Sequence, residues 1–88
     1  MINANEQYAV KRLTASGIVR SGQGGLGGFI VASGSPTIIL YDGIDATGTV
    51  ILNTMQTSVA TSYPFPYVCS TGVYATITGT ADITFFIN

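Results

Sequence analysis

The sequence contains no histidine, no tryptophan and a single cysteine, and only 8% of its 88 residues are charged. A lone cysteine excludes an intrachain disulfide, and without histidine there is no obvious metal site. Three cations and a net charge of −1 provide no basic patch to neutralise nucleic-acid phosphates. No apolar run approaches the roughly 18 residues of a membrane-spanning helix. We therefore expect no cofactor, no nucleic acid and no membrane partner.

The high hydrophobic and low charged content of the sequence indicates one small domain that gains stability from contacts with other proteins. Hydrophobic residues make up 47% of the chain, and its mean hydropathy is +0.46. The surface of a monomer normally carries about 25–35% charged side chains, so part of the apparent outside is expected to be buried by oligomerisation or docking. The N-terminus lacks the basic and apolar regions of a secretory signal. We expect the protein to be made in a cytoplasm and kept or assembled there.

The chain divides into a polar N-terminal arm and one domain. Residues 1–12 form the predicted arm, because its first eight residues show no hydrophobic pattern. Residues 13–88 form the predicted domain. Scattered apolar side chains favour weak strands at residues 8–13 and 17–20, and a short helix over residues 6–13 is the alternative for the first of them.

Residues 37–55 form the centre of the predicted fold. Two β-branched, apolar runs flank a connection rich in Gly and Asp, which predicts an antiparallel hairpin with a long loop. Such a hairpin belongs in the middle of a sandwich, or packs one face on its own core and the other on a partner. Regular alternation makes both faces apolar, with Ile38, Leu40, Val50 and Leu52 on one side and Ile39, Tyr41 and Ile51 on the other.

The glycine-rich stretch before this hairpin has the spacing of a dinucleotide-binding loop at Gly22, Gly24 and Gly27. Such a loop must follow a buried strand and open a helix, but residues 29–33 are β-branched and aromatic. We interpret the stretch as part of a strand, where the glycines permit a bend, a bulge or the close approach of another backbone.

An alternating aromatic and proline segment follows the hairpin. Pro64 and Pro66 make the segment extended and exclude it from the centre of a sheet. Tyr63, Phe65 and Tyr67 then project from one face. They form either a surface that recognises a partner or caps over an open end of the sandwich core.

The last residues, 72–88, read as a second hairpin with residues 79–81 in its loop. The register that pairs Ile77 with Ile83 and Ala75 with Phe85 separates a core face from an outer face rich in threonine. With the earlier elements, this predicts an all-β fold, a small antiparallel β-sandwich of jelly-roll or immunoglobulin-like type with about seven or eight short strands.

No group of residues forms a catalytic pattern. Asp42 and Asp45 share one loop and could form a carboxylate pair or a Ca²⁺ site, but the loop lacks the oxygen-ligand density of known calcium loops. Loop aspartates more commonly bond backbone amides, and Cys69 reads as a small buried thiol. We therefore expect no enzyme and no catalytic, metal-binding or cofactor-binding residues. The groups considered for catalysis are Glu6, Asp42, Asp45, Cys69 and Asp82.

Four segments together resemble small β-sandwich proteins encoded among the structural genes of tailed bacteriophages. The resemblance covers roughly residues 17–88 and consists of turn and strand signatures without a catalytic signature. Its segments are residues 24–28 with the apolar strand that follows, residues 40–49, residues 63–66, and residues 72–82 before the final aromatic strand.

The resemblance implies a virion protein that is assembled in the host cytoplasm. Its main expectation is a capsid decoration, or cement, protein that bridges major capsid protein subunits as a homotrimer. The alternative is a small tail, fibre or neck component, which includes the case of a receptor- or glycan-binding module in which Tyr63, Tyr67 or Tyr74 stacks on sugar rings. The expected contact residues for capsid docking are Ile2 and Tyr8 from the arm, and Tyr63, Phe65 and Tyr67.

Overall fold

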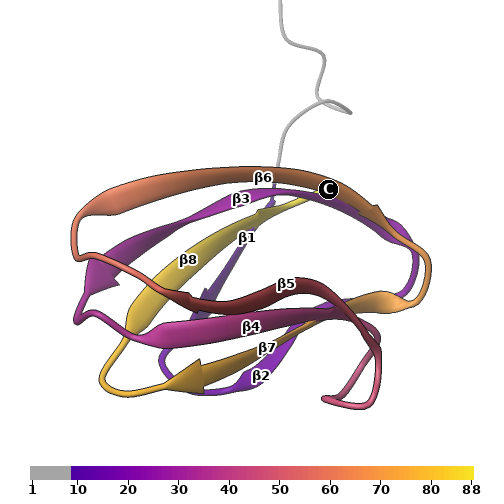
Figure 1. The fold of residues 1–88 in the computed structure, drawn as a ribbon. Helices are drawn as coiled ribbons and strands as arrows, with labels where there is room; N and C mark the ends of the chain where they lie inside the picture. Colours follow the sequence, from indigo (N-terminus) through magenta and orange to yellow (C-terminus); the bar gives the residue numbers. More distant parts are fainter. Residues whose placement is uncertain (1–8) are drawn as a thin grey trace, which may run out of the picture.

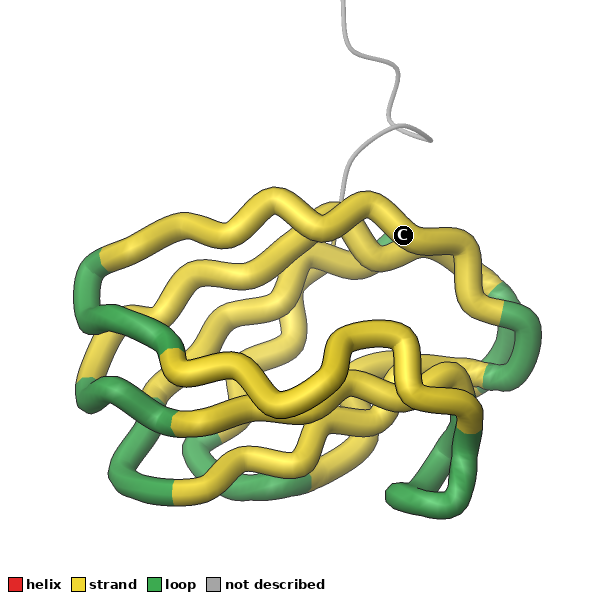
Figure 2. The backbone as a smooth tube through the Cα atoms, in the orientation of Figure 1, coloured by secondary structure: helices red, strands yellow, loops and turns green. Residues whose placement is uncertain are grey.

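The computed structural model describes residues 9–88, which fold into an all-β sandwich. Two antiparallel sheets of four strands face each other, as Figures 1 and 2 show. Sheet A has the strand order β1-β8-β3-β6, and sheet B has the order β2-β7-β4-β5. The strands are β1 (Ala9–Leu13), β2 (Gly17–Ser21), β3 (Gly24–Ser33), β4 (Thr37–Asp42), β5 (Thr49–Gln56), β6 (Thr61–Cys69), β7 (Gly72–Thr78) and β8 (Asp82–Ile87).

The core lies between the sheets because alternate positions of the central strands are apolar. In sheet A, the ring of Phe29 lies 5.2 Å from that of Tyr63 and 5.5 Å from that of Phe85, measured between centroids. In sheet B, Ile38 and Leu40 are fully buried. This period-two burial is the pattern of sheets packed face to face. The buried apolar set is Val19, Leu26, Phe29, Val31, Ile38, Leu40, Cys69, Val73, Ala75, Ile77, Ala81, Ile83 and Phe85.

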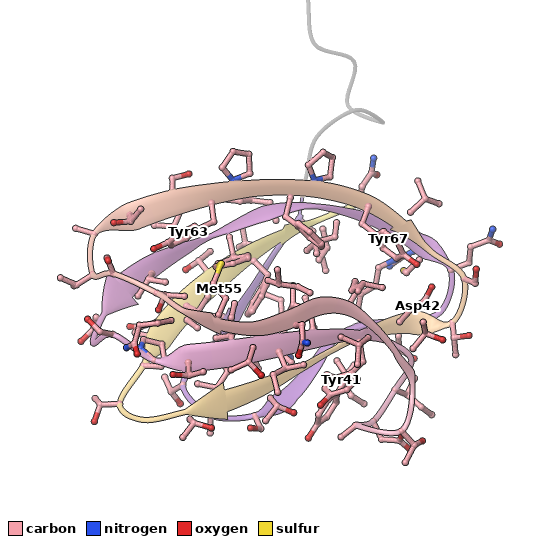
Figure 3. The ribbon with its side chains drawn as sticks, viewed as in Figure 1. Tyr41, Asp42, Met55, Tyr63 and Tyr67 are labelled. Carbon is pink, nitrogen blue, oxygen red and sulfur yellow. The ribbon has the colours of Figure 1, made fainter. Side chains whose placement is uncertain are left out.

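The two lateral sides of the sandwich differ. On one side the backbones of edge strands β1 and β2 approach each other, and on the other side β5 and β6 lie farther apart. Half-buried apolar side chains pack against the core there; Met55 and Tyr63 both point into the space between the sheets (Figure 3). The set is Ile51, Leu52 and Met55 from β5, and Tyr63, Phe65 and Tyr67 from β6.

Strands β4 and β5 pair antiparallel, which confirms the central hairpin. The regular alternation predicted across it is wrong for Val50, and also for Ile51, which packs against the core instead of sharing the side of Ile39 and Tyr41. Leu40 pairs with Leu52, but the next residue, Tyr41, pairs with Val50, so Ile51 is the extra residue of a bulge. The bulge turns Val50 to the outer side of the sheet, beside Tyr41. Its position could not be predicted from the alternation of apolar residues in the sequence.

The predicted C-terminal hairpin is wrong. Strand β7 pairs with β2 and β4 in sheet B, whereas β8 pairs with β1 and β3 in sheet A. Ile77 and Ile83 face the core, as the pattern indicated, but they do so from opposite sheets. Alternation tells which side of a strand is buried and does not identify the neighbouring strand.

The glycine-rich stretch enters strand β3, as predicted, and the strand has an irregular register between Leu26 and Gly28. At Gly28 the φ angle is 144°, and a Cβ would lie 2.5 Å from the carbonyl oxygen of Tyr63. Close approach of β6 therefore requires glycine at this position.

The two weak strands are confirmed as β1 and β2, and the helical alternative is wrong for residues 9–13. Of the predicted arm, residues 1–8 lie outside the described residues. Residues 9–12 form most of β1, which pairs with β8 at the edge of sheet A.

Candidate interaction surfaces

The aromatic row of β6 faces inward. Tyr63, Phe65 and Tyr67 are half-buried and pack against the core. The hydroxyl of Tyr63 accepts a hydrogen bond from the backbone N–H of Ser58 at 2.8 Å, and the hydroxyl of Tyr67 donates to Asp42 Oδ2 at 2.9 Å. Both polar tips are thus bound within the chain. The structure brings these three predicted contact residues together, while Ile2 and Tyr8 lie outside the described residues.

Asp42 joins the two sheets at the end of β4. Its carboxylate accepts N–H bonds from Ser70 at 3.0 Å and Thr71 at 2.9 Å, in addition to the hydroxyl of Tyr67 on β6. The N–H groups of Ser70 and Thr71 lower the pKa of Asp42, and the bond to Asp42 raises the pKa of Tyr67. The view in Figure 3 places Tyr67 above Asp42 across the gap between the sheets. Asp42 therefore acts as a clamp on the turn between β6 and β7.

The other candidate chemical groups have local partners. Asp45 Oδ1 accepts the N–H of Thr47 at 2.9 Å, an Asx turn, and the pKa of Asp45 is lowered by its bonds with Thr47. Cys69 is buried, with Sγ 3.1 Å from the carbonyl oxygen of Gly24. Asp45 and Cys69 therefore both make contacts within the fold.

A bidentate pair joins β1 to β8. Arg12 Nε lies 2.7 Å from Asp82 Oδ1, and the second guanidinium bond, to Oδ2, is 2.9 Å long. The bond to Arg12 lowers the pKa of Asp82 and raises that of Arg12. The guanidinium is largely exposed, so this pair contributes little to stability.

Neither a metal centre nor a membrane span emerges from the described part of the chain. Within residues 9–88, no three His, Cys, Asp or Glu side chains lie close enough together to hold a metal ion. The same residues include no helix that is long and apolar enough to cross a membrane.

The outer side of sheet A carries apolar side chains, which we call the sheet A face. One row runs across all four strands, with Phe86 paired to both Val10 and Gly28, and Gly28 paired to Pro64. Val10 is 62% exposed and Val68, farther along β6, is 74% exposed. The residues of the sheet A face are Val10, Ile30, Pro64, Pro66, Val68 and Phe86.

The outer side of sheet B carries a second row. Tyr74 of β7 pairs with Ile18 of β2 and with Tyr41 of β4, and Tyr41 pairs with Val50 of β5. We call these four residues the sheet B row. Ile18 is 41% exposed and Val50 48% exposed, and the two tyrosine rings lie 6.2 Å apart, measured between centroids.

All four strand edges are poorly suited to pairing with another strand. Edge strand β6 has Pro64 and Pro66, and β1 has Lys11 and Arg12. Strand β5 has two register shifts, and the short strand β2 has one beside Val19. Prolines, charges and bulges are the devices that protect exposed edges. The sheet faces are therefore better suited than the strand edges to contact with another protein.

Comparison with protein-family models, curated proteins and solved structures found no match for this chain. The two outer rows were not predicted from the sequence, because each joins strands that are distant along the chain. The available signal was the apolar second side of residues 37–55, which includes Tyr41.

Proposed function

We propose that the protein is a non-enzymatic structural component of a tailed-phage virion, a capsid decoration protein that binds the major capsid protein. The observation that carries the proposal is the sheet A face, an apolar surface that the other residues of the described range, 9–88, leave open on the outside of the sandwich. Large exposed apolar patches mark protein interaction sites. The resemblance of residues 17–88 to phage virion proteins supports the choice of partner.

Because Tyr63, Phe65 and Tyr67 face the core, the proposed docking surface lies on the opposite, outward side of β6. Tyr63 and Tyr67 use their hydroxyls within the chain, so Pro64, Pro66 and Val68 are the apolar β6 residues open to a partner. Both prolines have fixed φ angles, which lowers the conformational entropy lost on binding. Residues 1–8 of the predicted arm come directly before β1 in the sequence, and β1 lies at an edge of the same sheet.

The mechanism is additive burial of apolar surface. Each square ångström of apolar area removed from water contributes about 25 cal/mol, against which stands the entropy lost on association. A shell offers many equivalent sites, so small contributions repeated over the particle oppose the outward pressure of the packaged genome.

Docking is tested with three valine-to-lysine variants added to particles that lack the protein. Val10→Lys and Val68→Lys put a charge in the sheet A face, and we expect each to lower the affinity for the particle at least about tenfold. Val59→Lys is the matched control, because Val59 is 52% exposed in the turn between β5 and β6. Equal occupancy for all three variants would refute docking through this face.

The arm is tested by deleting residues 1–8. We expect the deleted protein to keep its circular dichroism spectrum and cooperative unfolding but to lose occupancy on particles. Unchanged occupancy would contradict a role of the arm in docking.

A further inference from the structure

The sheet B row has an order that reads nearly the same from either end. Across the sheet it runs Ile18, Tyr74, Tyr41, Val50, so an aliphatic residue stands at each edge and a tyrosine on each central strand. Register sets this order, because all four residues are outward-facing partners in consecutive ladders. In Figure 3, Tyr41 projects from sheet B away from the sandwich interior.

Because the sheet B row has this symmetric order, it can pack against the same row of a second copy. A twofold axis parallel to the strands and lying between β4 and β7 places Ile18 of one copy over Val50 of the other. The same axis places Tyr74 of each copy over Tyr41 of its partner. Closed pairs of identical chains use such isologous contacts, in which one patch meets itself.

The surroundings of the row favour contact with an identical surface. The other outward positions of the two central strands are uncharged: Thr37, Ile39, Thr76 and Thr78. Two copies of this face therefore meet without like-charge repulsion from these strands. In the described part of the chain, the hydroxyls of Tyr41 and Tyr74 have no hydrogen-bond partner, in contrast to those of Tyr63 and Tyr67.

We propose that the sheet B row binds a second copy of this chain in an isologous, face-to-face pair. Four strands about 4.8 Å apart and about six residues long offer roughly 400 Å² of flat area per copy. A stable interface buries about 800 Å² per partner, so the pair is weak and depends on concentration. A high local concentration, as on an assembled particle, favours its formation.

Sedimentation of the purified chain over a concentration series tests the pair. The wild-type molar mass is expected to rise from one chain toward two, and Val50→Lys is expected to weaken association at least about tenfold. Val68→Lys is the matched control on the opposite sheet and should associate like wild type. A wild type that stays monomeric up to about 1 mM, a plateau at three chains, or normal association of Val50→Lys would overturn the proposal.

Crosslinking tests the axis. A short bismaleimide should link Ile18→Cys chains to Val50→Cys chains in a mixture and give little product with either variant alone. Cys69 is buried and does not compete in the folded protein. Self-crosslinking of each variant without the mixed product would place the axis across the strands and overturn this pairing.

The proposed pair and the proposed capsid docking can be tested independently of each other. The proposed pair uses sheet B and the proposed docking uses sheet A, so Val50→Lys should still bind particles and Val68→Lys should still self-associate. Loss of both functions in both variants, with the fold intact, would overturn the assignment of one face to each contact.

Discussion

Replacing Asp42 tests how the two sheets are tied together. The carboxylate is the shared acceptor for Ser70, Thr71 and Tyr67, and it lies where β6 of sheet A turns into β7 of sheet B. Asp42→Ala removes these three bonds at once, together with the longer bond of 3.4 Å from the N–H of Gly72. The N–H groups of Ser70 and Thr71 then lose their side-chain acceptor within residues 9–88, and Tyr67 loses its hydrogen bond to β4.

The expected loss of unfolding free energy in Asp42→Ala depends on how exposed the hydrogen-bond donors to Asp42 are. Ser70 and Thr71 are exposed, so water replaces the carboxylate there at a loss of about 0.5–1 kcal/mol each, and the half-buried Tyr67 bond adds about 1 kcal/mol. The sum is about 2–3 kcal/mol. A chain of 88 residues has a total stability of about 4–13 kcal/mol. The loss corresponds to a fall in Tm of roughly 10–20 °C.

Thermal and urea unfolding of Asp42→Ala beside Asp45→Ala measures this effect. Asp45 is a suitable control because, within residues 9–88, its carboxylate bonds only Thr47, two residues away, in an exposed loop. We expect Asp45→Ala to unfold close to wild type. Equal Tm values for the two variants would refute the assignment of Asp42 as the clamp between the sheets.

The stabilisation by Asp42 also depends on pH. Its pKa in the folded protein lies below its ordinary value, so its contribution is fully present above the unfolded pKa and is lost as pH falls through the folded pKa. Asp42→Asn does not titrate at this position. The difference in unfolding free energy between wild type and Asp42→Asn should therefore be constant near neutrality and shrink below about pH 4. A difference that grows in acid would contradict the direction of the pKa shift.

Three further predictions concern the fold. Gly28→Ala should lower the free energy of unfolding by about 2 kcal/mol or more, because its Cβ meets the backbone of β6. A Cβ at Gly22 meets nothing within 4 Å, so Gly22→Ala should lower it by about 1 kcal/mol. Urea midpoints that coincide for the two variants would contradict this difference. Cys69 should react with a thiol reagent at the rate of unfolding, and fast labelling of the folded protein would show that it is not buried. Arg12→Ala should leave Tm nearly unchanged at high salt, because its pair with Asp82 is exposed; a large loss would show that the pair ties β1 to β8.

Much of the fold could be predicted because the relevant signals are local. Period-two alternation indicated the strands, the prolines of β6 placed that strand at an edge, and the glycines before Phe29 predicted an irregular β3. Pairing between strands is not local. Residues Ile77 and Ile83 have the same pattern whether their strands form a hairpin or lie in opposite sheets, and their sequence proximity favoured the wrong choice.

The candidate surfaces show the same limit. The sequence indicated that Tyr63, Phe65 and Tyr67 share one side of a strand, but not whether that side faced a partner or the core. The row of Tyr41 and Tyr74 needed both the register of β4 with β7 and the bulge in β5. Interaction surfaces on a sandwich are built across strands, so they become visible only when the topology is known.

The copy number of this chain in purified particles tests the proposed function most directly. Quantitative mass spectrometry against the major capsid protein gives the ratio of the two chains. A ratio near one to one is the result that the decoration proposal predicts, since a shell offers equivalent sites over its whole surface. A handful of copies per particle would move the protein to the tail, neck or fibre, and absence from particles would contradict a virion role altogether.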